Sequence, residues 1–347
     1  MSASRPPAAP ATALARPWLL ADIGGTNARF GWLGNAGGAG AGADVVSHVQ
    51  TLAAADHGGP AAAAQVYLAD MAARLGSAFQ RPAAAAFAVA TAVGGDALSF
   101  TNSGWNFSRA AVQAELGLQQ LLLLNDFEAL ALSLPRLSST QTVFFGGPGR
   151  PTAAIAGSPL AVIGPGTGLG VAGLVPTAHG WVAVPGEGGH ASLAAADDFE
   201  AAILAAVRQH HAHVSAERLL SGIGLPVLHA AVALVLGQTT PGLNTGEIVE
   251  RGLAQSDVAC SRSLDSFCAL LGSFAGNVAL TLGARGGVYI GGGIVPRLGE
   301  RFFTSSFRQR FEAKGRFAPY LQAVPTALIT DTLAALGGAA LALEQHG

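Results

Sequence analysis

Two glycine-rich stretches, each lying between two apolar runs, constrain the fold of this chain more than any other feature. The first stretch, Asp22–Asn27, separates Trp18–Ala21 from Phe30–Leu33. The second, residues 164–170 (GPGTGLG), separates residues 160–163 from 171–175. Apolar runs on both sides of a glycine turn predict two β-strands joined as a hairpin. Because the arrangement occurs twice, the chain is expected to contain an internal duplication.

Length and composition favour two domains of layered α/β architecture. At 347 residues the chain exceeds what one compact core usually holds. Only 7% of the residues are aromatic and 47 are glycine, so the core must be built from Ala, Leu and Val with many turns. A net charge of -2 with 12% charged residues gives no basic stripe for nucleic acid and no polybasic patch for a membrane. We therefore expect a small-molecule partner bound in a crevice.

Apolar spacing and helix breakers predict the other elements. Ser108 is expected to cap a helix that ends at Gly117. The run Leu121–Leu124 predicts a central strand covered on both faces, with Asn125 and Asp126 at its carboxyl end. A final helix is expected to cross back onto the first domain. Further strands are predicted near 85–93, 287–290 and 324–330, and helices near 68–79, 127–134, 198–208, 215–220, 226–236, 258–282 and 332–343.

No segment of the sequence predicts export or membrane insertion. Residues 1–16 are rich in Ala and Pro without a continuous apolar run, which predicts a flexible tail, with a transit peptide as the open alternative. Apolar runs such as Ala83–Val93 are shorter than the roughly 20 residues that span a bilayer. Cys260 and Cys268 match neither a zinc spacing nor a CxxC pair, which favours buried thiols. We expect a soluble, cytoplasmic protein.

The two glycine turns are candidate phosphate sites. Consecutive glycines let backbone N–H groups converge on an anion, and the first turn adds the Asp22 carboxylate and the Thr26 hydroxyl. The second turn adds the hydroxyl of Thr167. Two such turns facing across a cleft would hold a chain of phosphates from both sides. A single such turn favours an ordinary hairpin over a phosphate site, and it is the presence of two turns that favours phosphate.

Other phosphate and hydrolase motifs are absent from the sequence. A P-loop requires GxxxxGK, and the one lysine of the chain is Lys314, in Ala-Lys-Gly. Residues 168–173 match GxGxxG, but the following residues predict a strand where a dinucleotide site needs a helix. There is no GxSxG elbow and no HExxH.

Four acidic or imidazole side chains are candidates for substrate chemistry. Asp126, at the carboxyl end of a strand, suits a general base, or equally a cap of the helix that follows. Glu187 and His190 lie among glycines, which suits a loop that binds a polyol or an ordinary surface turn. Glu217 follows Ser215 near a helix start, where an acid is stabilised by the helix dipole without any function.

Several segments, taken in order, resemble the bacterial glucokinase family, the hexokinase-related group without the zinc motif of repressor-type sugar kinases. The resemblance runs from about Trp18 to the C-terminal helix. After Asp331 the chain reads TLAALGG where the family tends to have a Pro-Gly pair. The matching segments are residues 22–29 (DIGGTNAR), 124–127 (LNDF), 164–170 (GPGTGLG), 185–190 (PGEGGH), 213–222 (HVSAERLLSG), 291–297 (GGGIVPR) and 314–317 (KGRF).

The resemblance implies a ribonuclease H-like, actin/hexokinase-type ATPase fold of two α/β domains that close on the sugar. We assign residues 17–136 plus 331–347 to a small domain and 137–330 to a large one. The implied enzyme is a cytoplasmic homodimer of glycolysis that uses ATP and Mg²⁺ to phosphorylate the 6-hydroxyl of glucose. Alternatives are a kinase of fructose or mannose, or a non-catalytic sugar-sensing regulator, although no basic helix-turn-helix segment precedes residue 18.

The resemblance also implies roles for individual residues. Asp126 is the implied general base, and Asp22 the implied Mg²⁺ ligand, directly or through water. The implied sugar-binding residues are Asn102, Asn125, Asp126, Glu187, His190 and Glu217. The implied ATP- and phosphate-binding residues are Asp22, Gly24, Gly25, Thr26, Asn27, Gly166, Thr167, Gly168, Gly291, Gly292 and Gly293.

Overall fold

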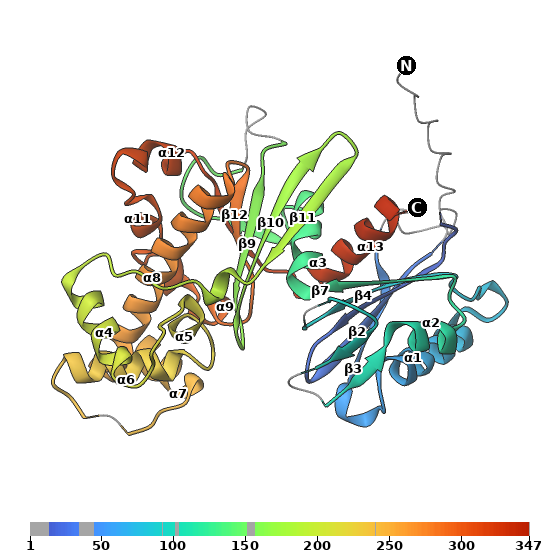
Figure 1. The fold of residues 1–347 in the computed structure, drawn as a ribbon, viewed down its shortest axis with the longest axis horizontal. Helices are drawn as coiled ribbons and strands as arrows, with labels where there is room; N and C mark the ends of the chain where they lie inside the picture. The colour runs from blue at the N-terminus through green and yellow to red at the C-terminus, as the bar shows by residue number, and fades with distance from the viewer. Residues whose placement is uncertain are drawn as a thin grey trace, which may run out of the picture. The chain divides into compact units, whose positions relative to one another are not determined.

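The computed structural model describes residues 14–34, 45–91, 93–100, 104–150, 157–239 and 241–346 (Figure 1). The chain divides into two compact units. Unit 1 comprises Met1–Ser133 and Leu333–Gly347, and unit 2 comprises Leu134–Thr332. The predicted tail falls largely on residues 1–13, which lie outside the described residues.

Unit 1 is built on a five-stranded sheet with the order β3-β2-β1-β4-β7. Strand β1 pairs antiparallel with β2 and parallel with β4, and β4 pairs parallel with β7. The first predicted hairpin is therefore confirmed. The strands of this sheet are β1 (Trp18–Ile23), β2 (Asn27–Leu33), β3 (Ser47–Ala53), β4 (Ala84–Val89) and β7 (Gln120–Asn125), and β5 (Ala97–Ser99) and β6 (Asn106–Ser108) form a separate ribbon.

Helices cover both faces of this sheet. Phe30 stacks on Tyr67 of α1 (Pro60–Leu75). The neighbouring Gly31, on the opposite face, approaches Leu336 of α13 (Ala334–His346). Helix α2 (Arg109–Leu116) has Ser108 as its N-cap, which accepts from the Ala111 amide, and left-handed Gly117 as its C-cap, as predicted.

The position of Leu121–Leu124 differs from the prediction. These residues form β7 at an edge of the sheet, paired only with β4 among the described strands, and not a central strand. Leu121 and Leu124 are buried, whereas Leu122 and Leu123 are half-buried. Helices α2, α3 (Asp126–Ser133) and α13 all contact β7. The apolar run is therefore explained by the helices that pack on the strand. Hydrophobicity shows that a strand is covered, but it does not show whether another strand pairs with it on each side.

The last helix returns to unit 1, as expected. Helix α13 packs on α3, and the two lie side by side in Figure 1. A Cβ at Gly338 would stand 1.7 Å from the Ala129 carbonyl oxygen, so the helices meet backbone to backbone. Glycine is the residue that permits this approach.

Unit 2 is built on a six-stranded sheet with the order β11-β10-β9-β12-β13-β8. Strand β9 pairs antiparallel with β10, which confirms the second hairpin, and parallel with β12. Because residues 169–177 form a strand, the GxGxxG match is accidental, as predicted. The strands are β8 (Thr142–Phe144), β9 (Leu160–Pro165), β10 (Leu169–Thr177), β11 (Gly180–Gly186), β12 (Gly287–Ile290) and β13 (Thr326–Ile329).

Helix α8 (Val258–Leu282) is the central helix of the unit 2 core. It is long and apolar enough by length and composition to cross a membrane, contrary to our prediction that no run is long enough. However, 72% of its most apolar window is buried within the structure, and Cys260 and Cys268 are buried free thiols on it. The other helices of the unit are α4 (Asp198–Arg208), α5 (Ala216–Leu219), α6 (Leu225–Val235), α7 (Thr245–Leu253), α9 (Val295–Leu298), α10 (Glu300–Phe303), α11 (Phe307–Glu312) and α12 (Ala318–Gln322).

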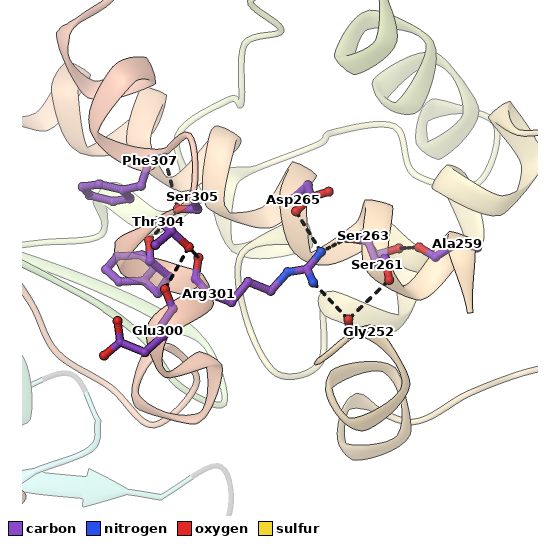
Figure 2. Close-up of polar contacts among 11 residues, drawn as sticks. Gly252, Ala259, Ser261, Ser263, Asp265, Glu300, Arg301, Thr304, Ser305 and Phe307 are labelled. Atoms are coloured by element: carbon purple, nitrogen blue, oxygen red, sulfur yellow. Dashed lines mark hydrogen bonds and ion pairs between the residues drawn. The ribbon is translucent and has the colours of Figure 1, made fainter. Parts of the chain in front are cut away.

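One arginine joins three of these helices (Figure 2). The Arg301 guanidinium, on α10, donates to the Gly252 carbonyl at the end of α7, to the Ser261 carbonyl on α8 and to the Asp265 carboxylate, at 2.9 to 3.0 Å. Its side chain is 19% exposed. Because buried backbone carbonyls need partners, this arginine fixes how α10 meets α7 and α8.

Candidate functional site

In unit 1 the candidate residues gather at the carboxyl ends of three parallel strands. Asp22 on β1 stands opposite Ala88 on β4, and Ala88 stands opposite Leu124 on β7. Asn125 ends β7, and Asp126 begins α3. Asp22 and Asp126 therefore lie at the same edge of the sheet, the edge at which parallel α/β sheets bind ligands.

Asp22 forms an ion pair within the first hairpin. The Arg29 guanidinium donates to its Oδ2 at 3.0 Å across the β1–β2 pair. Burial raises the pKa of Asp22, and the charge of Arg29 and its hydrogen bond oppose that rise. The Arg29 charge thus favours the ionised form of this half-buried carboxylate, which is the form that a cation needs.

Asp126 contacts the first turn of α3 and has a raised pKa. Its Oδ1 accepts from the Phe127 amide at 3.0 Å, and the same amide donates to the Asn125 Oδ1 at 2.9 Å. Both side chains thus contact the first turn of α3. Burial raises the pKa of Asp126 to about 6; the hydrogen bond from Phe127 opposes this rise, and the nearby Asp22 charge adds to it. A carboxylate with a pKa near neutrality suits proton transfer better than an ordinary aspartate does.

The first glycine turn uses one of its backbone amides in a hydrogen bond within the turn. The Gly24 amide donates to the Asn27 carbonyl at 2.9 Å and so is used within the turn. In the described part of the chain the Gly25 and Thr26 amides have no acceptor. Asn125 Nδ2 donates to the Thr91 carbonyl at 3.3 Å, while Asn102 lies outside the described residues.

The second glycine turn, in unit 2, has a similar division of donors. The Gly166 amide donates to the Gly168 carbonyl at 2.9 Å, and the Gly166 carbonyl accepts from the Gly222 amide at 2.7 Å. Over the described ranges the amides of Thr167 and Gly168 have no acceptor. These two amides, more than that of Gly166, can bind an anion.

Residues 291–293 lie against the second turn. The Gly291 amide donates to the Ile163 carbonyl at 2.8 Å. Gly292 has a φ of +78°, and a Cβ there would stand 2.4 Å from the Pro165 carbonyl oxygen. Only glycine fits both the left-handed backbone and this contact. The predicted adenosine and phosphate segments of unit 2 are therefore adjacent.

Glu187, His190 and Glu217 form one cluster in unit 2. His190 Nδ1 is 3.8 Å from Glu217 Oε1, and His190 Nε2 is 4.0 Å from Glu187 Oε2. The side chains of Glu187 and His190 are 81% and 60% exposed, whereas that of Glu217 is 25% exposed. Two carboxylates and an imidazole placed this close together offer several hydrogen-bond acceptors and donors, which suits adjacent hydroxyls of a sugar.

Two contacts at these sites were missed by sequence reasoning. Arg29 was part of a matched segment but was assigned no role, although its charge and spacing from Asp22 across a hairpin were visible. The hydrogen bond from the Leu169 amide to Glu217 Oε2, at 2.8 Å, joins residues 48 positions apart. No local pattern reports such a contact.

Comparison with known proteins decides the family. A family model described as Glucokinase matches residues 19–346. The chain belongs to the glucokinase family. A glucokinase of Chromobacterium violaceum is 49% identical over 331 residues, which cover 95% of this chain and 90% of that protein. One of Aromatoleum aromaticum is 47% identical over 328 residues, 94% of this chain and 95% of that protein.

Solved structures agree with this glucokinase assignment. The crystal structure of a glucokinase from an Antarctic psychrotroph has a TM-score of 0.84 at 38% identity, over 94% of this chain and 98% of that one. A ROK family glucokinase from Streptomyces griseus, in complex with glucose and AMPPNP, shares the fold at a TM-score of 0.58 and 19% identity, over 96% and 100%. The predicted family and hexokinase-type fold are confirmed. As a glucokinase, the chain transfers a phosphoryl group from ATP to the 6-hydroxyl of glucose.

Proposed function

We propose that Asp126 is the general base of this glucokinase and that the other candidate residues bind the two substrates. The observation that carries the proposal is the half-buried position of Asp126 at the carboxyl edge of the sheet, with a pKa raised to about 6. Phosphoryl transfer passes through a loose transition state, so its catalysis depends on positioning and on electrostatic stabilisation. Asp126 orients the 6-hydroxyl in line with the γ-phosphorus and accepts its proton as the new O–P bond forms.

Asn125, Glu187, His190 and Glu217 bind the sugar hydroxyls in this proposal, together with Asn102. The amides of Gly25 and Thr26 in the first turn, and of Thr167 and Gly168 in the second, bind phosphate oxygens. Residues 291–293 receive the adenosine. Three further residues assigned to ATP stabilise the two turns through hydrogen bonds within them. These residues are Gly24, Asn27 and Gly166.

Mg²⁺ fits the donors of unit 1. The described residues contain no cluster of three or more His, Cys, Asp or Glu that would hold a metal ion by itself. Mg²⁺ in kinases is bound through one or two carboxylates together with substrate phosphates and water, and Asp22 is a half-buried carboxylate beside the proposed phosphate turn. Asp22 would hold the ion, directly or through water, and the ion would neutralise charge on the transferring phosphate.

The sugar specificity is tested with a panel of hexoses. Purified enzyme with ATP and Mg²⁺ is assayed for ADP formation with glucose, fructose and mannose, and the product is identified by NMR. We expect glucose 6-phosphate, a much higher kcat/KM for glucose than for the other hexoses, and a loss of activity on chelation of Mg²⁺. Equal rates with fructose or mannose would favour the broader hexose kinase, and sugar binding without turnover would favour a regulator.

We further propose a cytoplasmic homodimer that acts in glycolysis. The family assignment supports this assembly and location. Sedimentation equilibrium of the purified enzyme tests the dimer, and a mass equal to 34.7 kDa would contradict it.

A further inference from the structure

The Glu217 carboxylate contacts two different parts of the unit 2 site. Its Oε1 faces His190 Nδ1 at 3.8 Å. Its Oε2 accepts a hydrogen bond from the Leu169 amide at 2.8 Å. Leu169 begins β10 and directly follows Gly168 of the second glycine turn. One carboxylate therefore contacts both the sugar-binding cluster and the phosphate turn.

The carboxylate packs directly on the turn. A Cβ at Gly168 would stand 2.5 Å from Glu217 Oε2, so there is no space for a side chain at that position. Gly189, next to His190, approaches the residue that follows the turn, because a Cβ at Gly189 would stand 2.0 Å from the Leu169 carbonyl oxygen. The turn and the residue that follows it therefore pack against the Glu217 carboxylate and against the backbone at Gly189.

The residues that follow helix α5 contact the turn at a second point. The Ser221 hydroxyl donates to the Glu217 carbonyl at 2.7 Å and fixes the exit of the helix. The next residue, Gly222, donates its amide to the Gly166 carbonyl at 2.7 Å. The segment that carries Glu217 therefore binds the turn on both sides of the two unpaired amides, those of Thr167 and Gly168.

These contacts decide which amides are available to an anion. The Leu169 amide is occupied by Glu217, and the Gly166 amide by Gly168. Without the Glu217 acceptor, the Leu169 amide is released, and the peptide between Gly168 and Leu169 is held against rotation only by the hydrogen bond from the Gly166 amide to the Gly168 carbonyl. Such a rotation would misdirect the donors that bind phosphate, because each turn amide shares its orientation with its neighbours.

We propose that Glu217 is a positioning residue for the phosphate turn in addition to a sugar ligand, so that nucleotide affinity depends on it even when no sugar is bound. This inference rests on the proposed function, which assigns the turn to phosphate and Glu217 to the sugar. Its distinct consequence is an effect on nucleotide binding alone.

The experiment measures the affinity of the enzyme for AMP-PNP with Mg²⁺ by calorimetry without sugar, and KM for glucose by steady-state kinetics. The variants are Glu217→Ala, Glu217→Asp and Glu217→Gln. Glu187→Gln is the matched control, because Glu187 belongs to the same cluster but is 81% exposed and its recorded contact is with His190. Glu217→Asp keeps the charge and replaces the alanine variant in the comparison if Glu217→Ala does not fold. A melting curve shows whether each variant is folded.

We expect Glu217→Ala and Glu217→Asp to weaken AMP-PNP binding about tenfold, as loss of a hydrogen bond to a charged group does. In Glu217→Gln the amide oxygen replaces Oε2 as acceptor, so AMP-PNP affinity should stay within about threefold of the wild type. Glu187→Gln should not change AMP-PNP affinity.

Two results would overturn the inference. The first is wild-type AMP-PNP affinity in both Glu217→Ala and Glu217→Asp. The second is equal weakening in Glu217→Gln and Glu217→Ala, which would assign the effect to charge and not to the Leu169 hydrogen bond. Failure of the proposed sugar role is separate, because it would leave KM for glucose unchanged in both Glu217→Gln and Glu187→Gln.

Discussion

The two glycine hairpins of this glucokinase have the same strand–turn–strand form but very different surroundings. In unit 1 the acids beside the turn, Asp22 and Asp126, are withdrawn from water, and burial raises the pKa of each. In unit 2 the sugar-binding candidates Glu187 and His190 are 81% and 60% exposed. The turn amides are similar in the two units, since each turn has one amide used internally and two without an acceptor in the described chain.

Each turn therefore offers two amide donors, whereas the side chains beside it differ in their exposure to water. A buried carboxylate with a raised pKa is suited to take a proton. Exposed donors and acceptors such as those of Glu187 and His190 are suited to exchange water for sugar hydroxyls. We therefore expect unit 1 to control the chemical step and unit 2 to control binding.

The sharpest test of this division is Asp126→Asn, which removes the proposed base and keeps the shape of the side chain. We expect kcat to fall by about 10² to 10⁴, the usual worth of general-base catalysis, with a smaller change in KM for glucose. Steady-state kinetics with glucose and ATP measure both constants.

The unit 2 counterpart is Glu187→Gln, which should raise KM for glucose and change kcat little. A loss of kcat in Glu187→Gln as large as that in Asp126→Asn would contradict the division between the units. A near-normal kcat in Asp126→Asn would remove Asp126 from the role of base.

A second test displaces α3, the helix that carries Asp126, without substituting any of the candidate site residues. In Gly338→Ala the new methyl group would stand 1.7 Å from the Ala129 carbonyl oxygen, so α13 and α3 must separate. We expect a loss of about 1–3 kcal/mol in the free energy of unfolding, as for other overpacked contacts, together with a lower kcat. Urea unfolding and kinetics measure the two effects.

The adjacent Gly337→Ala is the matched control. A Cβ at Gly337 meets no atom within 4 Å, and Gly337 lies in the same helix. Replacing a helical glycine with alanine should stabilise the protein by about 0.5–1 kcal/mol. Equal effects of the two substitutions would show that the α13–α3 contact is looser than described.

The smallest expected effect is a pH dependence that belongs to unit 1. Because Asp126 must be ionised to act as a base and its pKa is about 6, kcat/KM for glucose should fall about tenfold from pH 7 to pH 5. The raised pKa also means that the folded protein binds this proton more tightly than the unfolded chain. Asp126 therefore lowers stability above pH 6, and this cost disappears as the pH falls from about 6 towards 3.8.

Melting temperatures of the wild type and Asp126→Asn across this range test the sign. The variant should be the more stable of the two at pH 8, and its advantage should vanish near pH 4. An advantage that grows as the pH falls would show that the pKa of Asp126 is lowered and not raised.

Most individual elements could be predicted from the sequence because their signals are local. Both hairpins, the capped ends of α2 at Ser108 and Gly117, and the bounds of α8 follow from residues within a few positions of each boundary. The candidate residues that lie directly after strands, such as Asp126, could be found for the same reason.

The remaining features depend on which distant segments meet. The leucines of β7 predict apolar neighbours but not an edge position, because helices and strands bury a leucine equally well. The bond between the Leu169 amide and Glu217, and the contact of Gly338 with Ala129, join residues far apart in the sequence. A glycine in the sequence does not reveal which backbone approaches it.

The return of α13 to unit 1 has a consequence for how the protein is made. The strands of unit 1 leave the ribosome before unit 2, but the helix that covers β1, β4 and α3 is formed by residues 334–346, which follow unit 2. Because domains fold as units during synthesis, the nascent sheet must wait, with one apolar face uncovered, while all of Leu134–Thr332 is translated. Unit 2 has no such delay, so unit 1 begins before unit 2 and is completed after it.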